Sequence, residues 1–464
     1  MSTPEATGEL KRVLTPIHLW AIAVGLVISG DYFGWNYGLA QGGPIGMMIA
    51  TGLVTVMYVC FIFSYTELST AIPHAGGPFA YAHKAMGPFM GFLAGFATLL
   101  EFVFAPPAIA LAIGSYVHFR MPALPEIGVG IGAFVVFVSL NVIGVGIAAL
   151  FELVVTAFAV LELGIFFITT APHVQAANII TTPLLPFGWW GVFGAIPFGI
   201  WFYLAIEGVA MSAEEVINPR RDIPRGYIAG IITLVVLASG TLICTTGVMP
   251  WQELIKDDSP LPKALASVLS KDHWLTHMMV YLGLFGLLAS FHGIIMGYSR
   301  QVFALARSGY LPAFFARLHP TRRTPVAAIV GPAIIGVLAL LSGKTDMIIT
   351  VAVTGAIIMY IISMVSLFRL RRDQPHLDRP FIAPFYPVFP AIALVLAIVC
   401  LAAVVINNPG TSLITLGAFV AGTIYYQKAA APRVAAHDAA LARLAETAAN
   451  ADLATVAAAE HGAG

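Results

Sequence analysis

The chain has 464 residues, of which 59% are hydrophobic and only 10% are charged, and its formal net charge is zero. Average soluble domains carry about 25% charged residues, so the composition excludes a soluble protein and predicts an integral membrane protein. A net charge of zero also gives no reason to expect nucleic acid as a partner.

Twelve apolar runs approach or exceed the length of a spanning helix, which needs about 20 apolar residues. They do not alternate between apolar and polar residues, so they favour helices over barrel strands. In chain order they lie at residues 16–40, 45–69, 89–118, 124–143, 147–171, 190–211, 227–249, 274–305, 325–342, 345–368, 385–406 and 411–427.

The loops between these runs differ in charge. Of the 23 Lys and Arg residues, 18 fall on one side of the predicted membrane and five on the other. The positive-inside rule then places both termini in the cytoplasm, and an even number of helices agrees with that placement. We therefore expect a multi-pass protein of the cell's inner (plasma) membrane, surrounded by lipid.

The first run contains an acid where an apolar residue is expected. Residues 29–36 read Ser-Gly-Asp-Tyr-Phe-Gly-Trp-Asn. A carboxylate at the bilayer centre costs at least about 2.5–3.5 kcal/mol, and the glycines beside it weaken the helix. A break next to a charge inside a span is typical of a transporter binding site. The ligand of Asp31 is expected to be positively charged.

The sixth run has a second set of helix breakers, namely Gly194, Pro197 and Gly199. Five helices separate the two breaks in register, which predicts two inverted five-helix repeats with helices 1 and 6 broken. The expected divisions are a cytoplasmic tail at 1–15, repeats at 16–171 and 190–368, two extra helices at 385–427, and a cytoplasmic tail at 428–464.

Three stretches resemble the amino acid–polyamine–organocation transporters: residues 73–81, 214–224 and 299–312. The resemblance implies a LeuT-like, all-α membrane fold and transport by alternating access. Within this group, residues 28–36, 65–69 and 101–114 resemble ethanolamine permeases. Amino acid carriers of the group typically have Gly-Ser-Gly at the helix 1 break, whose amides hold the substrate carboxylate. Here the matching residues are Gly34, Trp35 and Asn36, which implies a substrate with an amine but no carboxylate.

The expected site combines acids with aromatic rings, which attract an ammonium group. Asp31 is the expected partner of the ammonium, and the resemblance implies that Glu101 lines the site and that Glu207 takes part in gating. The resemblance also implies that Trp201 contacts the substrate. Hydrogen bonding to loosened backbone is the alternative role for each acid. The remaining predicted substrate-binding residues are Ser29, Gly30, Gly34, Trp35 and Phe198.

Coupling is less well determined by the sequence. A proton acting through Glu101, Glu207 or His292 is one alternative, and uniport driven by the membrane potential is another. Two acids of the fifth run, Glu152 and Glu162, receive no role. The hydroxyl of the substrate is expected to bond a side chain such as Glu101, Asn36 or His292.

No cofactor or metal is expected. His273 and His277 have a suitable spacing for a metal but no evident third ligand, and the three cysteines lie far apart within apolar runs. Motifs of hydrolases and phosphate-binding enzymes are absent from the sequence, so an enzyme is not expected. An amino acid or polyamine permease, for example for putrescine, is the alternative transporter. A transporter-like amine sensor is less favoured because the tails are short.

Overall fold

The computed structural model describes residues 12–144, 148–255 and 257–461. Within these residues the chain forms helices joined by loops and contains no β-strand. One isolated backbone bridge joins Leu14 to Val216. The all-α prediction is therefore confirmed.

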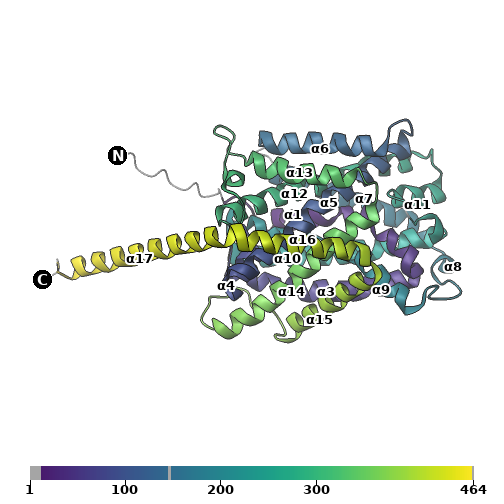
Figure 1. Ribbon diagram of the computed structural model, residues 1–464. Helices are drawn as coiled ribbons and strands as arrows, with labels where there is room; N and C mark the ends of the chain where they lie inside the picture. Colours follow the sequence, from purple (N-terminus) through teal and green to yellow (C-terminus); the bar gives the residue numbers. More distant parts are fainter. Residues whose placement is uncertain (1–11, 145–147, 256, 462–464) are drawn as a thin grey trace.

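Each of the twelve predicted spans corresponds to a helical segment (Figure 1). Nine helices in the described part of the chain are long and apolar enough to cross a membrane, and two shorter apolar helices cover the first and ninth spans. The segments are α1 (Pro16–Val27) with α2 (Ser29–Tyr32) and η1 (Trp35–Gly38), α3 (Leu39–Ala71), α5 (Pro88–Arg120), α6 (Glu126–Ile143), α7 (Ala148–Thr170), α9 (Gly188–Trp201) with η3 (Ile206–Glu215), α10 (Pro219–Val248), α12 (Trp274–Arg307), α13 (Val326–Leu340), α14 (Thr345–Asp373), α15 (Val388–Asn407) and α16 (Pro409–Tyr425).

Short helices connect these segments, and one long helix follows them. The last helix, α17, extends away from the bundle as the yellow helix in Figure 1. These elements are α4 (Pro78–Met86), η2 (Ala171–His173), α8 (Ala176–Ile179), η4 (Trp251–Glu253), α11 (Pro260–Leu269), η5 (Ala313–Ala316), η6 (Tyr426–Ala430) and α17 (Ala431–His461).

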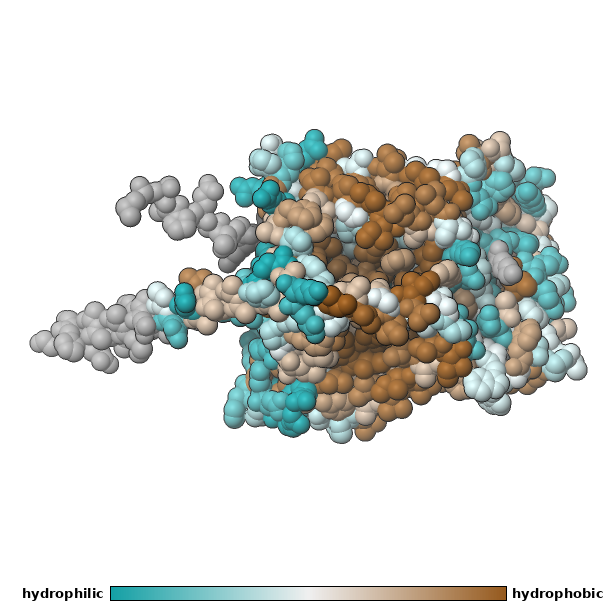
Figure 2. Space-filling model, in the orientation of Figure 1, coloured by the Kyte–Doolittle hydropathy of each residue, from teal (hydrophilic) through white to brown (hydrophobic). Residues whose placement is uncertain are grey.

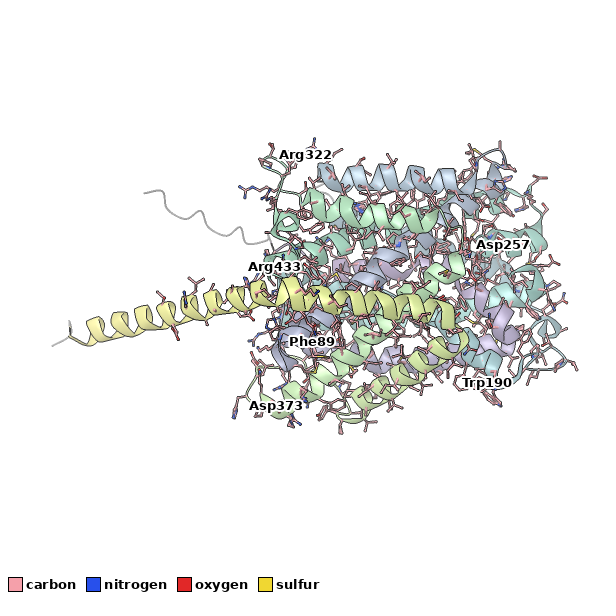
Figure 3. All side chains as sticks on the ribbon, in the orientation of Figure 1. Phe89, Trp190, Asp257, Arg322, Asp373 and Arg433 are labelled. Carbon is pink, nitrogen blue, oxygen red and sulfur yellow. The ribbon has the colours of Figure 1, made fainter. Side chains whose placement is uncertain are left out.

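The surface of the bundle is divided into an apolar middle and two polar ends (Figure 2). Many large apolar side chains are exposed, among them Ile168, Ile232 and Leu338. An apolar band of this kind is stable in contact with lipid, because water is absent from the bilayer core. The chain is therefore a multi-pass membrane protein. Figure 3 labels Asp257 and Trp190 at one end and Arg322 and Asp373 at the other. We name the end that contains Asp257 the Asp258 end, and the end that contains Asp373 the Glu67 end, because Glu67 bonds the nearby Arg371.

Helices 1 and 6 are both broken, as the LeuT-like fold requires. The break in helix 1 lies at Phe33 and Gly34, as predicted. The break in helix 6 lies elsewhere than predicted: α9 continues through Pro197, and the chain leaves the helix only after Trp201. Proline removes one backbone donor, but a helix packed inside a bundle tolerates this loss. The division into repeats at residues 171 and 190 stays a prediction.

The Glu67 end is closed by buried ion pairs. Glu67 is 1% exposed and accepts a hydrogen bond from Arg371 Nε at 2.8 Å. Arg379 forms a second ion pair with it, and the amide of Ala383 donates to it at 2.8 Å. These contacts join α3 to α14 and to the segment that follows α14. Because the carboxylate is fully paired, its burial is compatible with a stable fold.

We predict that Glu67→Gln lowers the thermal stability of the protein in detergent. Removing one partner of a buried ion pair costs about 3–5 kcal/mol, since the arginines lose their counter-charge. Asp373→Asn is the matched control, because Asp373 pairs with Arg372 at an exposed position. A thermal unfolding scan should show a clear decrease for Glu67→Gln and none for the control. Equal midpoints for the two variants would contradict the assigned role of Glu67.

Candidate functional site

The break in helix 1 is an abrupt change of backbone direction. Phe33 is extended, and Gly34 has φ of 90°, a conformation that a residue with a Cβ adopts only with strain. A Cβ at Gly34 would also lie 2.4 Å from Nε1 of Trp201. Glycine is therefore required here for two reasons, the backbone angle and the close approach of the indole.

The break in helix 6 is held by Glu101, an acid of α5. Ala205 has φ of 76°, which is strained for a residue other than glycine. Its amide donates a hydrogen bond to Oε1 of Glu101 at 3.1 Å, and both groups are buried. Glu101 thus satisfies a backbone donor that the break releases, which is the alternative role considered for this acid in the sequence.

The two breaks are in direct contact. A Cβ at Gly30 would lie 2.3 Å from the carbonyl oxygen of Trp201, so only glycine allows this approach. A cavity beside the contact has about 10 Å³ of free space, and Ser29 and Trp201 are among its lining residues. This volume is about that of one water molecule. The site is therefore closed, and the breaks must separate before a ligand can enter.

Several amides at the helix 1 break already have partners within the protein. The amide of Ser29 donates to Oγ of Ser290 at 3.0 Å, and the amide of Phe33 donates to the carbonyl of Ser29 at 3.3 Å. The amide of Gly34 donates to Oδ1 of Asn36 at 2.9 Å. These donors are not available to an anionic ligand without a rearrangement.

The side chain of Asn36 bonds three groups of the protein. Besides accepting from Gly34, it donates through Nδ2 to the carbonyls of Leu254 and Asp257, at 2.7 and 2.8 Å. Both N–H groups of Asn36 are thus used by the protein, and a bond between Asn36 and the substrate hydroxyl stays a prediction. An amide side chain in a dry site satisfies released backbone groups first, because unpaired ones are costly.

The side chain of Asp31, unlike that of Asn36, makes no hydrogen bond to the described residues. It is completely buried, and neither carboxylate oxygen has a hydrogen-bond partner among the described residues. The indole N–H of Trp201 is also buried without a partner in the same part of the chain. An uncompensated buried carboxylate is costly, so this group is a strong candidate for a cationic ligand.

A pair of buried carboxyl groups lies at the helix 6 break. Glu101 and Glu207 are both fully buried: Glu101 bonds the amide of Ala205, and Glu207 follows two residues later on η3. The hydroxyl of Tyr360 contacts Oε2 of Glu207 at 3.2 Å, and the hydroxyls of Tyr58 and Tyr360 are 2.8 Å apart. Two buried carboxyl groups at one break disfavour a second negative charge, so a proton on one of them stabilises the pair.

The other predicted residues lie around this centre. Trp35 donates through Nε1 to the carbonyl of Asp31 at 3.2 Å and stacks on Phe202. Phe198 stacks on Tyr37. His292 packs against the rings of Phe137 on α6 and Phe151 on α7, rather than against either break. The structure thus brings together the break residues, Glu101 and Glu207, but not His292.

Sequence reasoning did not identify Ser290 or Tyr360 as part of the site. Ser290 bridges the carbonyl of Gly25 and the amide of Ser29, and Tyr360 contacts Glu207. Both are polar residues inside apolar runs, which is a weak signal because hydroxyls are common in membrane helices. Among the described residues, no group of three or more His, Cys, Asp or Glu side chains could hold a metal ion.

Residues 254, 255 and 257–259, which we call the lid, lie at the Asp258 end against η1. Asp258 accepts hydrogen bonds from Tyr37 on η1, at 2.8 Å, and from Thr345 on α14, at 2.7 Å. Burial raises the pKa of Asp258 to about 6, while the hydrogen bonds from Thr345 and Tyr37 act in the opposite direction; the charges of Glu126 and Asp257 raise the pKa further. The lid therefore ties η1 to α14.

Comparison with known proteins gives a consistent result. The family model described as amino acid permease matches residues 14–426. An uncharacterized transporter of Rhizobium meliloti (strain 1021) is 32% identical over 84% of this chain and 85% of its own. The branched-chain amino acid permease BcaP of Bacillus subtilis (strain 168) is 25% identical over 84% and 87% of the two chains. The methylthioribose transporter of the same bacterium is 25% identical over 92% and 95%.

We predict that the lid opens more easily as the pH rises from about 4 to 7. An Asp258 exposed by opening would return towards its ordinary pKa of 3.8, so the closed lid binds a proton more tightly than the open lid. Closure is therefore favoured below pH 4 and loses this advantage as the pH rises through 6. The ratio of closed to open forms can change by roughly a hundredfold over this range.

The measurement is the labelling rate of a cysteine at Ser115, which lies under the lid next to Ser259, in a chain whose native cysteines are replaced by alanine. The same cysteine in an Asp258→Asn background is the reference, because it corrects for the pH dependence of the thiol itself. The labelling rate with Asp258 present, divided by the rate in the Asp258→Asn background, should rise with pH. A ratio that does not change would exclude Asp258 as the titrating group.

Proposed function

Because the chain belongs to the amino acid permease family, we propose that it is a transporter that imports ethanolamine. Its site at the two breaks would be open to one side of the membrane and then to the other. The observation that carries this proposal is the contrast at helix 1. Backbone amides there are bonded within the protein, whereas the carboxylate of Asp31 is buried without a partner. Such a site offers an acceptor for an ammonium group and few donors for a carboxylate.

The aromatic residues support a small alkylammonium. Trp201 lies against Gly34 and makes an edge contact with Phe33 at 5.5 Å between ring centres. A cation over an aromatic face gains about 0.5–2 kcal/mol, more when it is desolvated. In this proposal Asp31 pairs with the ammonium, and Ser29, Gly30, Gly34, Trp35, Phe198 and Trp201 surround it.

The alternative is an amino acid or polyamine permease. The name of the relative BcaP favours an amino acid, whereas the name of the methylthioribose transporter indicates that similar proteins are not limited to amino acids. Three buried acids, Asp31, Glu101 and Glu207, keep a diamine such as putrescine as a candidate. The amides of Ser29, Phe33 and Gly34 are bonded within the protein, and this is the reason to prefer a monoamine.

The carboxyl pair suits proton coupling. Glu101 holds the backbone of the helix 6 break, and Glu207 lies on the η3 segment that follows it, so a proton gained or lost by this pair of acids would alter the support of that break. We propose that this proton moves with the substrate. Uniport remains the alternative, since a monocation entering a negative cell gains about 2.3 kcal/mol per 100 mV.

The proposed orientation follows the charge distribution. The Glu67 end, which contains Arg371 and Arg379, faces the cytoplasm together with both termini, and the lid faces the outside of the inner membrane. This placement assigns opening of the lid to substrate entry. Opening of the Glu67 end, where Leu14 pairs with Val216, is assigned to release.

We predict that Asp31→Asn abolishes ethanolamine uptake into proteoliposomes while the protein remains folded. The amide keeps the size of the side chain but not the charge, and loss of one partner of a buried charge pair costs about 2–5 kcal/mol, a decrease of roughly a hundredfold in affinity. Radiolabelled uptake measures the effect, and Asp272→Asn in an exposed loop is the control.

Competition in the wild-type protein separates the alternatives. Small monoamines should displace ethanolamine more strongly than leucine, glycine or putrescine. Stronger displacement by a carboxylate-bearing compound would favour an amino acid permease, and stronger displacement by putrescine a polyamine permease. Normal ethanolamine uptake by Asp31→Asn would contradict the ammonium assignment.

We predict that Glu207→Gln abolishes accumulation driven by a pH gradient but preserves exchange of internal for external substrate. The amide cannot share a proton with Glu101, although it can still contact Tyr360. Imposing the pH gradient and the membrane potential separately measures the difference. Glu152→Gln is the matched control, because Glu152 is another buried acid of the bundle. Unchanged gradient-driven accumulation in Glu207→Gln would exclude this residue from coupling.

A further inference from the structure

The residue that follows Asp31 is fixed from two other helices. The hydroxyl of Tyr32 donates to Oε2 of Glu162 on α7 at 2.7 Å and approaches the carbonyl of Ala159 at 3.2 Å. The hydroxyl of Tyr116 on α5 donates to the carbonyl of Tyr32 at 3.1 Å. Both ends of Tyr32, its side chain and its backbone, are therefore bound by buried groups.

A third helix limits the position of the Tyr32 ring by shape. A Cβ at Gly286 of α12 would lie 2.6 Å from Cε2 of Tyr32, and one at Gly283 would lie 3.1 Å from Cε1. Glycine at these two positions leaves room for the ring. The ring is consequently held by packing against α12 and by the hydrogen bond to Glu162.

Glu162 has no evident reason to be an acid other than this bond. It is completely buried, and its second oxygen, Oε1, has no partner among the described residues. A leucine would fill a similar volume without the cost of burying a carboxyl group. A costly polar group with one specific contact indicates a role that depends on that contact.

We propose that Glu162 is a positioning residue for substrate binding, acting through Tyr32 to set the place of Asp31 in the helix 1 break. This inference rests on the proposed function, because it takes Asp31 as the partner of the substrate ammonium. Trp35 Nε1 holds the carbonyl of Asp31 from the other side. Because Tyr32 and the carbonyl of Asp31 are both fixed, the carboxylate of Asp31 is in position before the substrate arrives. This lowers the free-energy cost of binding.

The test is a double-mutant cycle with Glu162→Leu and Tyr32→Phe. Each change removes the same hydrogen bond, so each should raise the substrate concentration for half-maximal uptake about tenfold, with little change in maximal rate. The double variant should be no worse than either single variant. Glu162→Gln should restore most of the affinity, because its amide oxygen can still accept from Tyr32.

Two glycine variants complete the experiment. Gly286→Ala displaces the Tyr32 ring from the α12 side and should reproduce the loss of affinity. Gly164→Ala is the matched control on α7, because a Cβ there meets no atom within 4 Å. Its uptake should equal that of the wild type.

Additive effects of Glu162→Leu and Tyr32→Phe would overturn the proposal, as would losses confined to the maximal rate. If Glu162→Leu fails to fold, Tyr32→Phe, Gly286→Ala and Glu162→Gln still test the proposal: the first two should raise the half-maximal concentration without lowering the maximal rate, whereas Glu162→Gln should change neither. Failure of the proposed function looks different: the wild type would not take up ethanolamine. The cycle would then be measured with the amine or amino acid that the wild type does transport.

Discussion

The structure depends on one constraint: backbone released inside a membrane must find its partners within the protein. Water is not available in the bilayer core, and an unpaired amide or carbonyl there costs several kcal/mol. In this chain the partners are side chains from distant parts of the sequence. Ser290 and Asn36 take amides of the helix 1 break, and Glu101 takes an amide of the helix 6 break. Once these bonds are made, what remains unpaired defines what the site can bind.

The same bonds connect the two breaks to other parts of the bundle. Asn36 reaches from the helix 1 break to the backbone of the lid. At the helix 6 break, Glu101 of α5 bonds Ala205 and Tyr360 of α14 bonds Glu207. Gly30 and Gly34 allow Trp201 to press directly on helix 1. A packed contact of this kind has a small number of discrete arrangements. Movement of either break therefore changes the bonds of the other, which is a physical basis for alternating access.

The sequence predicted those features that depend on local composition. Long apolar runs identified the helices, and Asp31 beside Gly34 identified the first break, because charge and glycine both oppose a continuous spanning helix. Pro197 was misleading, since the bundle tolerates a proline inside α9 and the break lies instead at Ala205. No local signal marks Ala205, because its strained conformation is supported by Glu101, 104 residues away. The roles of Asn36 and Glu162 likewise depend on contacts between distant segments.

Selectivity in this arrangement comes as much from repulsion as from attraction. A zwitterionic amino acid would bring its carboxylate into a site that already contains Asp31, Glu101 and Glu207, all completely buried. Like charges in a weakly screened interior repel strongly, and the amides that would compensate for the carboxylate are bonded to Asn36 and Ser290. An alcohol in place of the carboxylate removes this repulsion and needs only a single donor or acceptor. Discrimination between two ligands depends on the difference in their binding free energies. For this reason the proposed site, with unpaired acids and amides bonded to Asn36 and Ser290, would favour an amino alcohol over the corresponding amino acid.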